Sequence, residues 1–196
     1  MNPLFDYISK RVEINTDNKN LINSLSKTLE LKKGTQLIKP NQSVTKTYFV
    51  LKGCLRSLIY DKGGKEHTLQ FALKNDWISD YIAIFNNETS TQTIECISDC
   101  NVIEVSIQEG IENLFSKLPE IESLHRKNLQ RHIVSLQKRI LNQMQLSSLE
   151  RYIQFQKQYP TIEKYALNYH IASYLGITQQ SLSRLRSQSI NKQIKQ

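Results

Sequence analysis

Between Leu31 and Ser106 the chain alternates apolar and polar residues with a period of two, and turn-forming residues divide this stretch into short segments. A period of two is typical of half-buried β-strands, whereas helices repeat their apolar positions every 3.6 residues. Seven or so short strands at this spacing imply a closed or sandwiched antiparallel structure. The expected strands are Thr35–Lys39, Lys46–Lys52, Cys54–Tyr60, Glu66–Leu73, Asp76–Phe85, Thr91–Ile97 and Asn101–Ser106.

Glycines mark two breaks in this β region. The stretch Asp61-Lys62-Gly63-Gly64 separates two strands and is the strongest hairpin signal, because glycine supplies the positive φ that a tight reversal demands. Gly53 interrupts a strand pattern, which indicates a bend or a close approach of another backbone segment.

Helical patterns flank the strands, so the sequence predicts an α+β chain. Pro3–Arg11 is expected to form one helix. A second helix, capped by Thr16 or Asp17, is expected to carry Leu21, Ile22, Leu25 and Leu29. After Gln108 the helical period returns, and Pro119 suits the first turn of a long helix that ends near Met144. The expected parts, argued below, are a sensor domain (1–118), a dimerisation helix (119–146) and a helix-turn-helix domain that binds DNA (147–196).

The expected long helix carries a narrow apolar seam. At about 1.5 Å per residue, about 26 residues span about 39 Å, which exceeds what the core of so small a domain requires. Such a seam suits pairing with a second copy about a two-fold axis. The alternative is an ordinary amphipathic helix packed on its own sheet. The residues predicted for the dimer interface are Leu129, Ile133, Leu136 and Ile140.

The net charge of +8 belongs entirely to the second part of the chain. Residues 1–118 carry 14 basic and 14 acidic side chains, whereas residues 119–196 carry 12 and 4. A basic half joined to a neutral half suggests contact with a polyanion, and both nucleic acid and a membrane surface fit that charge. No apolar run approaches the roughly 18 residues of a membrane span, and the start lacks a signal-peptide pattern. We therefore expect a cytoplasmic protein.

The most specific pattern is Asn168–Arg186, which predicts two short helices joined by a sharp turn. Asn168 is a suitable N-cap, and Gly176 supplies the left-handed residue that ends the first helix. Thr178 then caps the second helix, and Ala172 is small where the two helices cross. Alanine followed four residues later by glycine, with apolar residues at the core positions, is the helix-turn-helix pattern.

The second helix of this motif has a polar face without acidic residues. Glutamine pairs with adenine and arginine with guanine, while hydroxyl groups suit phosphates. The residues predicted to bind DNA are Thr178, Gln179, Gln180, Ser181, Ser183, Arg184 and Arg186.

Over roughly Leu31–Arg186 the chain resembles the Crp/Fnr family of bacterial transcription regulators. Tyr48–Gly53 is similar to the family's strand ending in glycine, and Asp61–Glu66 is similar to its hairpin. The resemblance implies a β-roll of the cyclic-nucleotide-binding type, a dimerisation helix and a (winged) helix-turn-helix in the major groove. It also implies that Gln179, Gln180 and Arg184 lie where family members read bases.

One departure from the family concerns the ligand. Members that bind cyclic AMP have a cassette in which Gly-Glu opens a short helix and Arg-Ser follows a loop later. The matching stretches here are Asp76–Phe85 and Thr89–Thr93, which offer neither the glycine nor the arginine. Asp80 would repel a phosphate, so we expect no binding of a cyclic nucleotide.

We expect the β-roll to enclose a pocket for an effector whose identity is unknown. Its carboxylate and hydroxyl groups favour a neutral or cationic small molecule, unless side chains fill the pocket and the protein works unliganded. The residues predicted to border it are Phe71, Ser79, Asp80, Tyr81, Thr91 and Gln92.

Cysteines and histidines predict neither a cofactor nor a metal. The three cysteines cannot form a disulfide framework, although a redox pair of Cys96 and Cys100 and simple buried thiols both remain open. An enzyme of the cupin type would need clustered metal ligands on its strands, and the β region offers only His67.

The sequence therefore predicts a homodimeric transcription regulator, not an enzyme, that reads an inverted repeat in double-stranded DNA, with RNA polymerase as a candidate further partner. The alternative is a signalling or adaptor protein that uses its basic half for contacts with proteins or membranes.

Overall fold

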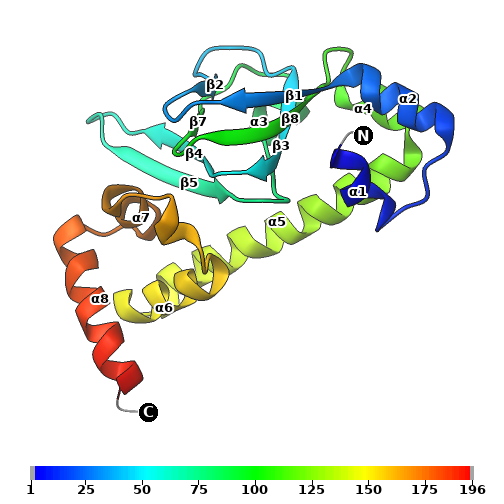
Figure 1. The fold of residues 1–196 in the computed structure, drawn as a ribbon. Coiled ribbons are helices and arrows are strands. Elements are labelled where there is room, and N and C mark those ends of the chain that lie inside the picture. Colours follow the sequence, from blue (N-terminus) through cyan, green and yellow to red (C-terminus); the bar gives the residue numbers. More distant parts are fainter. Residues whose placement is uncertain (1–2, 195–196) are drawn as a thin grey trace. The chain divides into compact units, whose positions relative to one another are not determined.

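The computed structural model describes the chain from Pro3 to Ile194, with side chains as far as Ser189. The chain divides into two compact units, one of residues up to 57 with 71–131, and one of residues 58–70 with those from 132 onward. Three elements have residues in both units: β4 (Leu55–Tyr60), β5 (Glu66–Ala72) and the long helix α5 (Pro119–Gln145) (Figure 1).

Two four-stranded sheets form the β structure. The first has the order β1-β8-β3-β6, with β1 at Ser26–Leu31, β8 at Cys100–Ser106, β3 at Lys46–Lys52 and β6 at Trp77–Ile78. The second has the order β2-β7-β4-β5, with β2 at Gln36–Ile38 and β7 at Thr93–Cys96. The pairings β1–β8, β3–β8, β3–β6 and β2–β7 are antiparallel. The predicted α+β class is confirmed.

Alternate side chains of β3 contribute to two separate apolar cores. Tyr48 and Val50 are buried in a cluster with Leu55, Ile94 and other residues of both sheets. Phe49 points the opposite way, into a cluster with residues of the N-terminal helices and α5. Both faces of this strand are therefore covered. The second cluster comprises Leu4, Phe5, Tyr7, Ile8, Ile22, Phe49, Ile103, Val105, Leu118 and Leu124.

The N-terminal helices are α1 (Pro3–Ser9) and α2 (Thr16–Leu25), and the second ends earlier than predicted. Leu29 lies in β1, which pairs with β8 from Ser26 opposite Val105 to Leu31 opposite Cys100. The prediction of a helix through Leu29 was wrong because pairing with a distant strand outweighs the local helical spacing. The cap is Asn15, whose side chain accepts a hydrogen bond from the Asn18 amide.

The segment predicted as one strand over Asp76–Phe85 is also different. It forms the short strand β6 and then helix α3 (Tyr81–Asn86). Asp80 caps this helix, since its carboxylate accepts hydrogen bonds from the amides of Ile82 and Ala83. The apolar run of this segment is compatible with either a buried strand or a short helix, and the cap at Asp80 favours the helix.

The predicted turns are confirmed. Asp61 accepts hydrogen bonds at its carboxylate from the amides of Gly63 and Lys65, which closes the hairpin between β4 and β5. Gly53 has a φ of 91°, and a Cβ there would lie 2.4 Å from the carbonyl oxygen of Asp99. A neighbouring backbone segment therefore comes closer than any side chain would allow.

The remaining helices are α4 (Ile111–Lys117), α6 (Ser148–Gln158), α7 (Asn168–Leu175), α8 (Gln179–Ile194) and the short 3-10 helix η1 (Ile162–Lys164). The predicted long helix from Pro119 is confirmed as α5. None of the helices between Pro3 and Ile194 combines the length and the apolar character needed to cross a membrane.

Candidate nucleic-acid interface

Helices α6, α7 and α8 pack around a small apolar core. Ile171 and Leu182 are completely buried, and Ala172 is 2% exposed where the two helices of the motif approach one another. Tyr174 of α7 contacts Phe155 of α6, with ring centroids 5.2 Å apart. The small residue predicted at the crossing of the two helices, Ala172, is thus buried there, and Ile171 and Leu182 hold α8 against α7.

The turn between α7 and α8 is built as the sequence predicts. Gly176 adopts the left-handed conformation, with φ at 69°, and its amide donates to carbonyl oxygens at the end of α7. Thr178 then caps α8, because its hydroxyl oxygen accepts a hydrogen bond of 3.1 Å from the amide of Ser181. The start of α7 differs: the Leu167 amide donates to the imidazole of His170, and Asn168 is the first helical residue instead of the cap.

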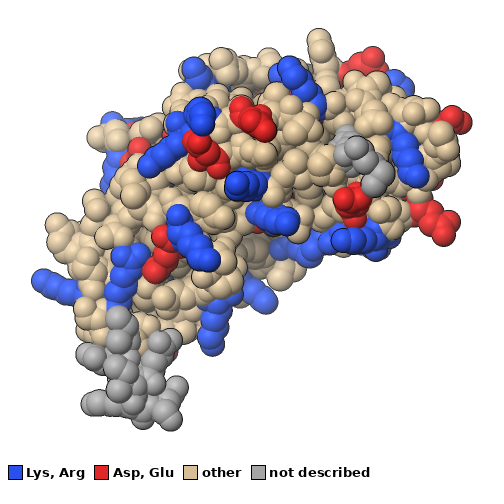
Figure 2. All heavy atoms as spheres, in the orientation of Figure 1, with Lys and Arg blue, Asp and Glu red and all other residues tan. Residues whose placement is uncertain are grey.

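The outer face of α8 is polar and open. Four of the residues predicted to bind DNA lie there with exposed side chains, and their side chains make no hydrogen bond or ion pair within the described part of the chain. Ser181 is half-buried, and its hydroxyl bonds with that of Thr178. Figure 2 shows Lys and Arg side chains around α6, α7 and α8, where acidic ones are few. The four exposed residues are Gln179, Gln180, Ser183 and Arg184.

Arg186 is placed differently from these four. Its Nε and Nη2 donate to Oε1 of Glu163 at 3.2 and 3.1 Å, and its Nη1 donates to the side chain of Asn168 at 2.6 Å. Glu163 also accepts a hydrogen bond from the hydroxyl of Tyr152. The guanidinium therefore ties α8 to η1 and α7, a role that the sequence pattern did not predict.

Arg139 on α5 is a second structural arginine that the sequence did not indicate. Its guanidinium donates to the carbonyl oxygens of Leu69, Thr68 and Tyr174 at 2.6, 3.0 and 2.7 Å. It also lies over the ring of Tyr174, 4.0 Å from the centroid. Ser173 of α7 also binds strand β5, because its hydroxyl oxygen accepts a hydrogen bond from the Thr68 amide. Within this unit, α7 is thus anchored both to α5 and to the β4–β5 hairpin.

The C-terminal half of α5 presents an apolar face to solvent. Of the predicted seam, Ile133, Leu136 and Ile140 are exposed, Ile140 by 60%. Leu129 is partly buried. The exposed face is broader than predicted, since it also includes Val134, Leu141 and Met144.

Of the six residues predicted to border an effector pocket, Asp80 and Gln92 lie in one hydrogen-bonded network. The Asp80 carboxylate accepts from the hydroxyl of Ser90 at 2.7 Å and from Nε2 of Gln92 at 3.2 Å, besides the two amides of α3. Ser79 donates to the carbonyl oxygen of Lys46. Phe71 is buried, Tyr81 is partly buried and Thr91 is exposed. The internal carboxylate therefore satisfies the amide groups that would otherwise face an anion.

The β structure contains a buried arginine that the sequence did not indicate. Arg56 on β4 is 1% exposed, and its Nε and Nη2 donate to Oε1 of Glu95 at 3.0 and 2.6 Å. The alternation of β4 gave no signal of this burial, because the residue that follows the core residue Leu55 is expected on the opposite face of the strand. This cation is neutralised by its own neighbour, so it offers no free charge to a phosphate.

The structure brings the cysteines together. All three are buried, and a hydrogen bond between the thiols of Cys96 and Cys100 lowers the pKa of Cys100 and raises the pKa of Cys96. Burial raises the pKa of Cys54. Of the two alternatives, burial favours simple buried thiols over a redox pair, because it shields Cys96 and Cys100 from oxidants.

Comparison with known proteins places this architecture. Residues 28–117 match the family model described as the cyclic nucleotide-binding domain. No curated protein sequence matches the chain significantly.

Solved structures cover almost the whole chain. A transcriptional regulator of the Crp/Fnr family from Eubacterium rectale is similar with a TM-score of 0.71 and 22% identity, over 91% of this chain and 85% of that one. FixK2 from Bradyrhizobium japonicum has a TM-score of 0.71 and 17% identity, over 86% of each chain. The c-di-GMP responsive global regulator CLP from Xanthomonas campestris has a TM-score of 0.68 and 12% identity, over 91% of this chain and 93% of its own. At such identities the similarity establishes the fold.

Proposed function

We propose that this chain is a transcription regulator that binds DNA through α8, because residues 28–117 match the model of the cyclic nucleotide-binding domain and the chain has the fold of the Crp/Fnr regulators. The observation that carries this proposal is the outer face of α8. Gln179, Gln180 and Arg184 project from the first two turns of a capped helix, and none is held by a described neighbour. These side chains suit base edges in the major groove, and the hydroxyl of Ser183 suits a phosphate.

A homodimer completes the proposed regulator. The exposed apolar side chains Ile133, Leu136 and Ile140 lie on one long helix, and a second copy related by a two-fold axis would bury them. Such a dimer presents two α8 helices, so its site is an inverted repeat with half-sites about one helical turn apart.

We further propose that no cyclic nucleotide regulates this protein. Asp80 supplies an internal anion to the amides of Ile82 and Ala83, and Glu95 neutralises Arg56. A cyclic phosphate entering this region would meet a carboxylate instead of an unpaired cation. CLP responds to c-di-GMP, which is a property of that relative.

Selection of bound sequences from a random DNA pool tests the proposed function. The expected result is enrichment of an inverted repeat by the full chain, with loss of one base preference per half-site in Arg184→Ala. Arg126→Ala is a matched control, because Arg126 is an exposed arginine on α5, outside the helix-turn-helix. If the wild-type chain enriched no sequence, the adaptor interpretation would replace this proposal.

A further inference from the structure

The first unit contains a largely apolar pocket that none of the predicted effector residues borders. Side chains from α1, α2, α4, α5 and the strands β3, β6 and β8 surround it. They leave about 590 Å³ between them, including the part open to solvent, and a cavity of about 40 Å³ within it. A cavity of about 10–15 Å³ holds one water molecule, so the cavity of about 40 Å³ has room for something larger. Leucine and isoleucine form most of its wall.

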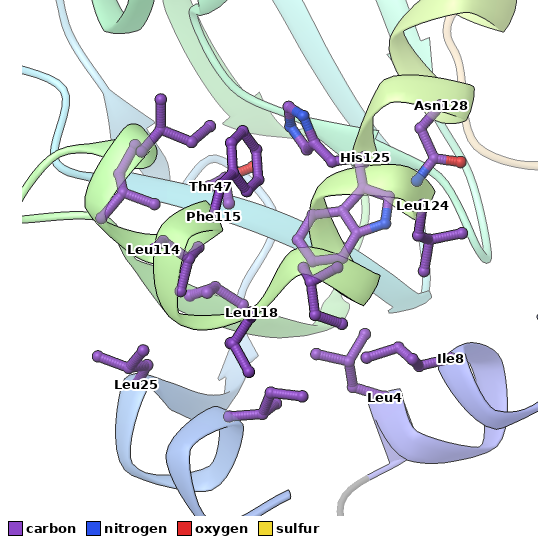
Figure 3. Close-up of a pocket in the computed structure, with 16 residues that line it drawn as sticks. Leu4, Ile8, Leu25, Thr47, Leu114, Phe115, Leu118, Leu124, His125 and Asn128 are labelled. Carbon is purple, nitrogen blue, oxygen red and sulfur yellow. The ribbon is translucent and has the colours of Figure 1, made fainter. Parts of the chain in front are cut away.

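His125 is one of four lining residues with polar side-chain atoms, the others being Thr47, Trp77 and Asn128. It lies on α5, is 9% exposed, and its Nε2 has no hydrogen-bond partner among the described residues. Its ring contacts Phe115 and Tyr81, with centroids 5.1 and 5.7 Å away, and Figure 3 shows the imidazole beside Phe115 at the pocket. A buried polar nitrogen without a partner destabilises the folded chain, so such a nitrogen at the wall of a pocket indicates a place for a ligand group that can hydrogen-bond to it.

The lining restricts what can bind. None of the sixteen lining residues is an acid, a lysine or an arginine. Burial lowers the pKa of His125 to about 4, so the imidazole is neutral at pH 7. A charged ligand would lose its hydration without gaining a counter-ion. Water is a poorer occupant than an apolar molecule, because it needs two to four polar partners and twelve of the sixteen lining side chains carry no polar atom.

We propose that this pocket binds a small, uncharged, mainly apolar molecule whose single hydrogen-bonding group meets Nε2 of His125. The site lies between the N-terminal helices and α5, apart from the network of Asp80. Leu118, Leu124 and His125 would report its occupation directly, since all three line the pocket and two of them lie on α5.

Nuclear magnetic resonance of the full chain tests binding, with cyclopentanol and methylcyclopentane as probes. The two molecules differ by a hydroxyl in place of a methyl group, and a hydroxyl can donate or accept whichever tautomer His125 adopts. Cyclopentanol is expected to shift the methyl signals of Leu118 and Leu124 and the Nε2 resonance of His125, and to bind about fivefold more tightly than methylcyclopentane.

His125→Phe should remove the preference for the alcohol, whereas His132→Phe should retain it. His132 is a half-buried histidine seven residues further along α5 and does not line the pocket. If His125→Phe did not fold, the His125 resonance of the wild-type chain would still decide. Absence of any shift at the pocket overturns the site, and equal binding of both probes without a shift at Nε2 overturns the assigned ligand class.

A regulatory consequence rests on the proposed function. Saturating cyclopentanol should change the affinity for the selected DNA site in the wild-type chain and leave His125→Phe unaffected. Unchanged DNA affinity despite confirmed binding overturns that consequence alone. Failure to select any DNA sequence overturns the proposed function, while the resonance measurements still judge the pocket.

Discussion

Arg186 and Glu163 form an ion pair in which both Nε and Nη2 of the guanidinium meet a single carboxylate oxygen, at 3.2 and 3.1 Å. The pair is partly exposed, so solvent screening limits its contribution to stability. Its importance is positional, because it joins α8 to the segment that precedes α7.

Arg186→Ala is therefore expected to lower the free energy of unfolding by about 1 kcal/mol, mostly through the lost hydrogen bonds to Glu163 and Asn168. DNA affinity should fall to a similar extent for every sequence, with the selected motif unchanged. Urea denaturation and fluorescence anisotropy with specific and random duplexes measure the two effects. Ser187→Ala is the control on the same helix. A changed base preference in Arg186→Ala would contradict the anchoring role.

Arg184→Ala should have the opposite pattern. The side chain is exposed and makes no hydrogen bond or ion pair with a described residue, so the free energy of unfolding should change by less than about 0.5 kcal/mol. Binding to the selected site should weaken by about 1–3 kcal/mol, because a contact with one base pair per half-site is lost. Anisotropy with duplexes altered at single positions checks this. Retained discrimination at all positions would place the contact elsewhere.

The apolar face of α5 predicts the consequence of one added charge. Leu136→Glu puts a carboxylate into the proposed dimer interface, where it cannot be solvated, and should yield monomers. Light scattering of the purified chain measures the mass. Lys138→Glu is the control, since Lys138 is an exposed residue of α5 that lies to the side of this apolar face and should leave the dimer intact. A dimeric Leu136→Glu would move the interface to another surface.

His125 predicts a pH dependence of stability. Burial lowers its pKa to about 4 in the folded chain, whereas an exposed histidine titrates near 6.5. Between these values the unfolded chain binds more protons, so stability falls as the pH drops from about 6.5 to 4. The expected loss from this group between pH 7 and pH 5 is about 2 kcal/mol. Urea denaturation at both pH values should show a smaller loss in His125→Phe than in the wild type, and equal losses would contradict this origin.

Asp80 is expected to matter more than an ordinary helix cap. Its buried carboxylate accepts from two amides, from Ser90 and from Gln92, so Asp80→Ala leaves several donors without partners. The expected cost is about 2–3 kcal/mol of unfolding free energy. Asn15→Ala removes an exposed cap with one donor and should cost about 0.5–1 kcal/mol. Similar costs for the two variants would show that the network around Asp80 contributes little.

Local sequence signals determined the elements whose geometry depends on one or two residues. Gly176 and Thr178 turn the chain between α7 and α8, because a left-handed residue and a capping hydroxyl each act on the adjacent backbone. The period-two alternation of β3 likewise places Tyr48 and Phe49 on opposite faces without reference to distant residues.

Tertiary structure alone decided the features that depend on partners far along the chain. Leu29 became part of a strand because β8, some seventy residues later, offers a free edge for pairing. Arg186 became an anchor because folding brings Glu163 within hydrogen-bond distance, and Arg139 finds carbonyl oxygens on both β5 and α7. The pocket beside His125 exists only where helices from both ends of the first unit meet. The spacing of residues in the sequence indicates which side chains share a face of a helix or strand. It does not indicate which other element that face will contact.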